Sequence, residues 1–278
     1  MNILAKANAV KLIDRYCYDS PSELNLEELL YAENLKLKEE PLLNCEGKIL
    51  FDGTMGIITV NSNFKDHNQK RFTISHEMGH FFNEKALTPP NLLPNRDRLF
   101  SKGEELNRVV FYRCGFESFY GKERNSIRES NANDFAAELL MHELWFVEKV
   151  KGKKLNAELL KDTAAFFNVS LSATAIRYTE IGHYPCAVVM TTNGVTKWKS
   201  ISEKFSYQFL RVGNKVSELS YTFDYYKGDK FPEGGDDIPA EAWFPEDFGL
   251  RKRRDARIWE LVFPFPKHSS ALVMLWEV

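Results

Sequence analysis

Several absences limit what this 278-residue chain can be. It has four cysteines and no Cys-x-x-Cys pair, so neither a disulfide framework nor a cysteine zinc site is indicated. No apolar run approaches the roughly 20 residues that span a bilayer. The first residues alternate apolar and charged side chains and lack the uninterrupted apolar core of a signal peptide. We therefore expect reduced thiols, no membrane insertion and a cytoplasmic location.

The chain also lacks an excess of basic charge. Its 37 Lys and Arg residues face 39 Asp and Glu residues, for a net charge of −2, so no overall positive field draws it to nucleic acid. The one basic cluster, residues 251–254 with Arg257, is followed by acidic Asp255 and Glu260. It indicates a solvated face, with a docking patch for an acidic partner as the alternative. We do not expect direct DNA binding.

The most informative segment present is His76-Glu77-Met78-Gly79-His80. This is His-Glu-x-x-His, in which one helix supplies two zinc ligands and a catalytic base. Residues i and i+4 lie on one helix face, so His76 and His80 can direct their imidazoles at one Zn²⁺. Glu77 lies about 100° around the helix, beside the metal, where its carboxylate can take a proton from water. The alternative is an ordinary helix that carries two unrelated histidines.

The neighbouring residues favour a packed helix. Apolar side chains recur at helical spacing, at Ile74, Met78, Phe81 and Phe82. Gly79 costs about 1 kcal/mol in a helix interior relative to alanine. A residue that weakens the helix there suggests that a second helix or a substrate backbone approaches closely.

A catalytic zinc site usually has three protein ligands and an open position. Residues 127–141 predict a second helix, and its small residues would allow close helix packing; these are Ala132, Ala136 and Ala137. Glu129 is the clearest candidate for the third ligand. Asn133, one turn on, could accept a hydrogen bond from a ligating histidine and fix its tautomer.

Other interpretations of this segment stay open at the sequence level. Glu129 could be a solvated residue of an ordinary amphipathic helix, and Glu123 and Glu138 are rival ligands. Glu138 follows Glu129 by about half a turn more than two full turns, so the two cannot serve together.

The two segments together resemble the ImmA/IrrE family of metallopeptidases. The first reads Arg-Phe-Thr-Ile-Ser-His-Glu-Met-Gly-His and ends at His80; the second reads Glu-Ser-Asn-Ala-Asn-Asp-Phe-Ala-Ala-Glu-Leu-Leu-Met and begins at Glu129. The family has such a histidine pair and a downstream Glu-x-x-Ala-Asn-x-Phe-Ala-Ala-x-Leu-Leu-Met-Pro helix. One departure is visible, because His142 stands where the family usually has proline. The looser similarity in organisation runs to about residue 182.

The resemblance implies an α+β fold with a minimal thermolysin-like zinc peptidase core over residues 1–182. His76, His80 and Glu129 would bind Zn²⁺, and Glu77 would be the catalytic base. Mn²⁺ or Fe²⁺ could occupy the same ligands. The implied role is the cleavage, in the cytoplasm, of a helix-turn-helix repressor, which switches on phage, mobile-element or stress genes.

The segments around the histidine pair carry further expectations. An Asp-Gly turn between residues 49–51 and 57–60 predicts a β-hairpin. By resemblance, residues 57–61 could form an edge strand that pairs with substrate; a plain core hairpin is the alternative. The long loop 87–107 could form a wall or lid over the site. The aromatic segment 111–120 could line specificity pockets or simply be core.

The remaining chain predicts a helical hairpin followed by strands. Residues 156–182 indicate a hairpin bracing the catalytic core rather than a helix-turn-helix DNA reader, because Arg177 is the only strong base-contacting candidate in its second helix. Residues 183–278 predict a smaller, mainly β domain for sensing or partner binding. Its expected strands lie near residues 186–190, 195–199, 205–212, 259–265 and 271–276.

Two functional hypotheses follow. The first is a zinc-dependent endopeptidase that hydrolyses a peptide bond in a specific protein, with His142, Tyr178 and His183 as candidates for stabilising the oxyanion. The second is a non-catalytic regulatory partner, such as an anti-repressor or a toxin–antitoxin component, that retains the peptidase fold.

Overall fold

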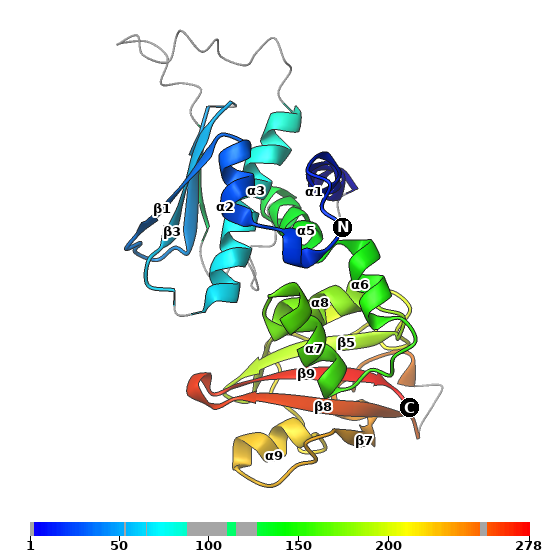
Figure 1. Ribbon diagram of the computed structural model, residues 1–278. Coiled ribbons are helices and arrows are strands. Elements are labelled where there is room, and N and C mark those ends of the chain that lie inside the picture. The colour runs from blue at the N-terminus through cyan, green and yellow to red at the C-terminus, as the bar shows by residue number, and fades with distance from the viewer. Residues whose placement is uncertain (1–2, 53, 65, 88–109, 115–126, 251–254) are drawn as a thin grey trace. The chain divides into compact units, whose positions relative to one another are not determined.

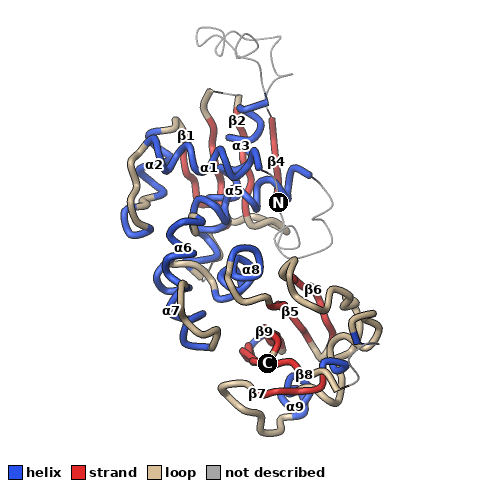
Figure 2. The backbone as a smooth tube through the Cα atoms, turned by 90° about the vertical axis from the view of Figure 1, so that its right-hand side faces the viewer, coloured by secondary structure: helices blue, strands red, loops and turns tan. Residues whose placement is uncertain are grey.

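The computed structural model describes residues 3–52, 54–64, 66–87, 110–114, 127–250 and 255–278. They form two compact units. The first comprises Met1–Trp145 with Phe166–Val169, and the second comprises Phe146–Ala165 with Ser170–Val278 (Figures 1 and 2). Contacts therefore group most of the helical hairpin with the C-terminal sheet. Our functional division at residues 182 and 183 stays a prediction.

The first unit is a four-stranded sheet with helices on one face (Figures 1 and 2). The strand order is β1-β3-β2-β4, with β1 parallel to β3 and the other pairs antiparallel. Its strands are β1 (Leu35–Glu40), β2 (Gly47–Phe51), β3 (Gly56–Asn61) and β4 (Val110–Cys114). Its helices are α1 (Ile3–Arg15), α2 (Leu26–Ala32), α3 (His67–Leu87) and α5 (Ile127–Leu140).

The predicted hairpin exists, but its second strand is not an edge. β3 pairs with β2 on one side and with β1 on the other, so its backbone groups have no side left for a substrate strand. The expectation that residues 57–61 pair with substrate is therefore wrong. Sequence pattern could not show this, because β1 lies outside the hairpin and pairs with β3 in parallel. Among the described strands, β4 is the one that borders β2 at the opposite edge.

Helices α3 and α5 pack at van der Waals contact. A Cβ atom on Gly79 would lie 2.9 Å from both the Cα and the carbonyl oxygen of Ala132. The ring of Phe82 stacks on that of Phe135, with centroids 5.5 Å apart. Gly79 thus fulfils the expectation that a second helix approaches there. Phe81 turns to the sheet and meets Phe51 edge to face, at 5.4 Å between centroids.

On its sheet side, α3 packs against the start of β2. Glu46, just before this strand, is buried, and its Oε1 accepts a hydrogen bond of 2.6 Å from Gln69 Nε2. Its Oε2 is buried without a hydrogen-bond partner among the described residues. Burial raises the pKa of the Glu46 carboxyl to about 7.

The second unit is a five-stranded antiparallel sheet in the order β6-β5-β9-β8-β7. Its strands are β5 (Cys186–Thr192), β6 (Val195–Ile201), β7 (Asp236–Pro239), β8 (Arg257–Phe265) and β9 (Ser270–Glu277). Its helices are α6 (Glu143–Val150), whose first residues belong to the first unit, α7 (Ala157–Phe167), α8 (Leu171–Ile181) and α9 (Tyr221–Lys227). α7 and α8 lie on one side of this sheet and α9 on the other (Figure 1).

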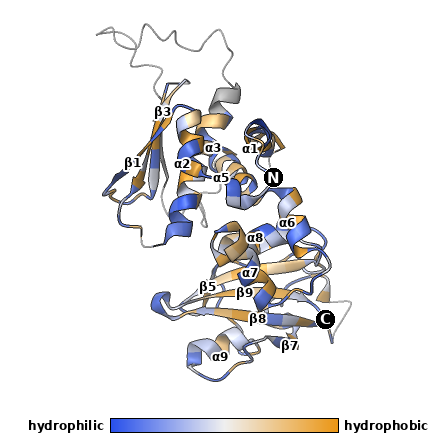
Figure 3. Cartoon of the chain, viewed as in Figure 1, coloured by the Kyte–Doolittle hydropathy of each residue, from blue (hydrophilic) through white to orange (hydrophobic). Residues whose placement is uncertain are grey.

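The three central strands of this sheet, β5, β9 and β8, are mostly apolar (Figure 3), in agreement with their burial. Asn193 and Gly194 both have positive φ, and they close the tight turn between β5 and β6. In the core, the Glu260 carboxylate accepts hydrogen bonds from Ser220 Oγ at 2.7 Å and from the Tyr221 amide at 2.8 Å. A buried carboxyl group thereby fixes the start of α9 to β8.

Four of the five predicted strands of this half are present, and the α+β fold class is confirmed. The strand predicted at residues 205–212 is wrong, because this segment is irregular. Phe205 and Tyr207 are buried at alternate positions, which produced the strand-like pattern. The following amides of Gln208 and Phe209 donate to the Asp247 carboxylate, at 2.8 and 2.7 Å, instead of to a neighbouring strand.

The predicted helical hairpin also exists as α7 and α8. Ser170 caps α8 by accepting a hydrogen bond from the Ala173 amide at 3.1 Å. Arg177 is buried and pairs with Glu180 at 3.3 Å, so it is not exposed for contacts with bases. Across the described residues, no helix combines the length and apolarity needed to cross a membrane.

The helix contact generates a stability prediction. Gly79→Ala should gain about 1 kcal/mol from helix propensity, but the new methyl meets the α5 backbone, and overpacking costs about 1–3 kcal/mol. We expect a net decrease in the free energy of unfolding, measured by urea titration. A more stable variant would contradict the close packing of α3 on α5.

A second prediction concerns Glu46 and pH. Its pKa is 4.5 in the reference state and about 7 when folded, so folding retains a proton between these values and stability falls as pH rises through this window. Glu46→Gln stays neutral and avoids this loss. We expect the stability of the variant relative to the wild type to rise by on the order of 2 kcal/mol from pH 5 to pH 8. A difference independent of pH, in denaturant titrations at both pH values, would contradict the assignment.

Candidate metal centre

The middle of α3 carries the three polar residues of the His-Glu-x-x-His segment, and all three are buried in the first unit. His76 and Glu77 are fully buried, and His80 is 2% exposed. The helix begins after Asp66, whose Oδ1 accepts a hydrogen bond of 2.8 Å from the Asn68 amide, the usual role of an N-cap aspartate. Three ionisable side chains within a buried helix are costly unless they are paired or bind a ligand.

Glu129 in the first turn of α5 meets both histidines. Its Oε2 lies 3.2 Å from His76 Nε2, and its Oε1 lies 3.4 Å from His80 Nε2. The two histidine Nε2 atoms are 3.1 Å apart. Zinc bonds of about 2.0–2.1 Å in a tetrahedral site place ligand atoms roughly 3.3 Å from one another. The donor types and their spacing therefore fit a zinc ion.

Asn133 contacts the other ring nitrogen of His76. Its Oδ1 lies 2.8 Å from His76 Nδ1, so a proton on Nδ1 is donated to the amide oxygen and the lone pair of Nε2 is left for a metal. This is the contact expected from the one-turn spacing between Glu129 and Asn133.

The protonation states of the group also suit a metal. Burial lowers the pKa of His76, which favours its neutral form. Burial alone would raise the pKa of Glu129, but its contacts with His76 and His80 outweigh this and hold the pKa well below its usual range. Neutral imidazole and ionised carboxylate are the forms that bind metal.

The Glu77 side chain lies against β2. A Cβ atom on Gly47 would lie 2.7 Å from Glu77 Oε1, so the carboxylate rests against the first residue of that strand. Sequence reasoning missed Gly47, because only the packing of β2 on α3 brings these residues together.

The rival candidates lie elsewhere. Glu138 pairs with His142 Nδ1 at 2.7 Å and lies 3.9 Å from Lys6 Nζ, so it is not a member of the group around His76. His142 lies just beyond the end of α5 as the partner of this glutamate, and its role as an oxyanion-stabilising residue stays a prediction. Tyr178 and His183 belong to the second unit. Glu123, most of the loop 87–107 and residues 115–120 lie outside the described residues.

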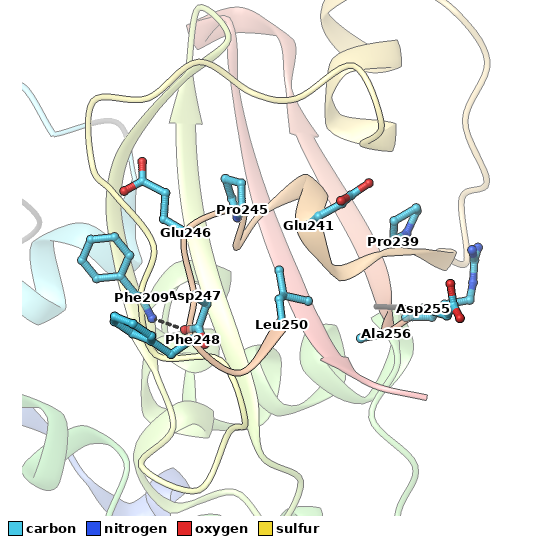
Figure 4. A pocket seen from close by; sticks show the side chains of 11 residues that line it. Phe209, Pro239, Glu241, Pro245, Glu246, Asp247, Phe248, Leu250, Asp255 and Ala256 are labelled. Carbon is cyan, nitrogen blue, oxygen red and sulfur yellow. Dashed lines mark hydrogen bonds between the residues drawn. The ribbon is translucent and has the colours of Figure 1, made fainter. Parts of the chain in front are cut away.

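A hollow of about 880 Å³ in the second unit is a different kind of site (Figure 4). Two of its carboxylates already have partners, since Asp247 accepts from backbone amides and Glu246 pairs with Arg211 at 2.9 Å. Among the described residues, one group of three or more His, Cys, Asp or Glu side chains could hold a metal ion. It consists of His76, His80 and Glu129, whose donor atoms all lie within 4.8 Å of one another.

Comparisons with known proteins agree with this geometry. The solved structure of a Mycobacterium tuberculosis transcriptional regulator is similar with a TM-score of 0.59 at 12% sequence identity, over 100% of this chain and 89% of that one. At this identity the similarity concerns the fold alone. No curated protein matches the sequence significantly.

The sequence itself matches a family model described as the IrrE N-terminal-like domain, Peptidase_M78, over residues 33–111. The match contains β1 to β3, the whole of α3 and the start of β4, and it therefore includes His76, Glu77 and His80. It ends before Glu129, whose place beside the histidines rests on the geometry alone. Residues 33–111 thus match the model of the IrrE N-terminal-like family, which agrees with the resemblance seen in the sequence.

Proposed function

We propose that this chain is a zinc-dependent endopeptidase that cleaves a specific protein, a helix-turn-helix transcriptional repressor. The observation that carries the proposal is the meeting of three metal-binding side chains at tetrahedral spacing, with a buried glutamate next to one of them on the same helix. The match of residues 33–111 to a metallopeptidase family model supports the reaction class. The structural neighbour is named a transcriptional regulator, which is consistent with a substrate involved in gene regulation.

His76, His80 and Glu129 would hold the metal. Bound there, zinc would lower the pKa of a water molecule and polarise the scissile carbonyl group. Glu77 would accept the proton of the attacking water and pass it to the leaving amine, the two proton transfers that peptide hydrolysis requires. Asn133 would keep His76 in the tautomer that ligates through Nε2.

The edge strand β4 is the element best placed to bind an extended substrate. It pairs with β2, and in this register Cys114 lies opposite Gly47, the residue that Glu77 touches. An extended peptide that adds to the outer edge of β4 would pass near this end of the sheet, with its backbone bound by strand pairing. This assignment replaces residues 57–61 as the proposed substrate-binding strand.

Metal content tests the ligands. After zinc loading and desalting, the wild type should retain about one zinc per chain, measured by elemental analysis. His80→Ala and Glu129→Ala should each lose it, because two donors do not hold the ion through desalting. His142→Ala is the matched control, since this histidine lies outside the group, and it should keep the metal. A wild type without metal after loading would contradict the proposed site.

Cleavage tests Glu77. Labelling of protein N-termini in a treated cell extract should reveal new termini with the wild type and none with Glu77→Gln, although this variant keeps its zinc. Glu143→Gln, a change at an exposed glutamate, should cleave like the wild type. Equal cleavage by Glu77→Gln would refute the mechanism. Loss of a repressor's DNA binding without any new terminus would favour the non-catalytic partner instead.

A further inference from the structure

Gly47 occupies a position where a side chain does not fit. A Cβ atom there would lie 2.6 Å from Thr73 Cγ2, 2.7 Å from Glu77 Oε1 and 3.2 Å from Glu77 Cγ. Real Cβ atoms essentially never approach other heavy atoms closer than about 3.0 Å. Any residue other than glycine would have to displace Thr73, Glu77 or the strand itself.

The backbone conformation does not explain this glycine. Gly47 is not among the described glycines with positive φ, and it lies in a strand, where glycine weakens the pairing and contributes no packing. A strand glycine of this kind often marks a place where another group approaches the backbone closely. Here the approaching group is the Glu77 carboxylate.

The backbone of β2 is held in place at Gly47. Gly47 pairs with Val60 of β3 on one side and with Cys114 of β4 on the other. The preceding residue, Glu46, is tied to α3 through its hydrogen bond with Gln69. The backbone at Gly47 is thus fixed relative to both the sheet and the helix that carries Glu77.

Thr73 limits the same space from the helix. Its Oγ1 donates to the carbonyl oxygen of Gln69 at 3.0 Å, which fixes the side chain, and its Cγ2 is the atom nearest to the position of a Gly47 Cβ. Thr73 and Glu77 are four residues apart and lie on one face of α3. Thr73 and Glu77 therefore both lie against the backbone of β2 at Gly47.

We propose that Gly47 is a positioning residue for Glu77: its bare backbone forms the surface that seats the carboxylate beside the metal centre. The catalytic consequence rests on the proposed function, in which Glu77 transfers the proton. Gly47 touches neither metal nor substrate in this role, and it acts only through the conformation of Glu77.

The test compares Gly47→Ala with Gly56→Ala. Gly56 is also the first residue of a strand, and its Cβ would lie 2.8 Å from Leu35 Cδ2 and 3.0 Å from Phe51 Cβ, none of them a site residue. Both variants therefore carry an overpacking cost. In crystal structures of the zinc-loaded variants, Gly47→Ala should show the Glu77 carboxylate displaced with the three metal ligands in place, and Gly56→Ala should show it unmoved.

Kinetics provide the second readout, on a synthetic peptide that spans a bond found by terminus labelling. Gly47→Ala should lower kcat by about tenfold to a hundredfold with little change in KM, because misplacement by about 1 Å can cost that much. Gly56→Ala should keep the wild-type kcat per folded chain. An undisplaced Glu77 in Gly47→Ala, or an unchanged kcat, would overturn the proposal.

A double variant separates positioning from destabilisation. Thr73→Ser removes the Cγ2 methyl, so Gly47→Ala/Thr73→Ser should recover stability and fold even where the single variant does not. Its Glu77 should stay displaced and its kcat low, because the new Cβ still meets the carboxylate. A double variant in which Glu77 returns to its wild-type position and kcat returns to the wild-type value would overturn the proposal. A displaced Glu77 together with a wild type that cleaves nothing would instead refute the proposed function and leave the positioning role standing.

Discussion

The contact between the backbones of α3 and α5 at Gly79 and Ala132 determines the geometry of the candidate metal centre. A carboxylate reaches only a few ångströms from its own helix, so Glu129 can meet His76 and His80 only where the two helices nearly touch. The same approach brings Asn133 to the second nitrogen of His76. A wider separation would leave the two buried histidines of α3 without their carboxylate partner, which costs free energy.

The two sides of α3 supply different parts of the site. The side that faces α5 gains the third donor and the amide that orients His76, while the side that faces β2 carries Glu77 against Gly47. The Glu46–Gln69 hydrogen bond holds the strand to the helix at that point, although it leaves a buried carboxyl with a raised pKa. This buried carboxyl lowers the stability of the fold next to the site, at the point where the position of β2 matters for Glu77. Such local losses of stability are common around functional groups.

The part of the site on α3 and α5 could be predicted because it depends on residue spacing along helices. The part formed by β2 could not, because it depends on which strands pair. The i, i+4 histidines, Gly79 as a point of close approach and the Glu129–Asn133 turn all depend on helical periodicity. The pairing of β3 with β1, and the neighbourhood of Gly47 and Glu77, depend on strand order, which the hairpin pattern does not contain. The irregular segment around Phe205 and Tyr207 misled for a related reason, because its side chains are buried alternately while the next backbone amides donate to Asp247 and not to a neighbouring strand.

The assignment of Glu129 shows how sequence and geometry complement each other. The family match ends before this residue, and the similarity to a solved structure at 12% identity concerns the fold alone. What distinguishes Glu129 from Glu138 on the same helix is the set of contacts, since one carboxylate meets two imidazole nitrogens and the other pairs with His142. The half-turn offset between the two glutamates directs them to different neighbours. One helix can therefore complete a candidate metal centre at its start and form an ordinary structural ion pair near its end.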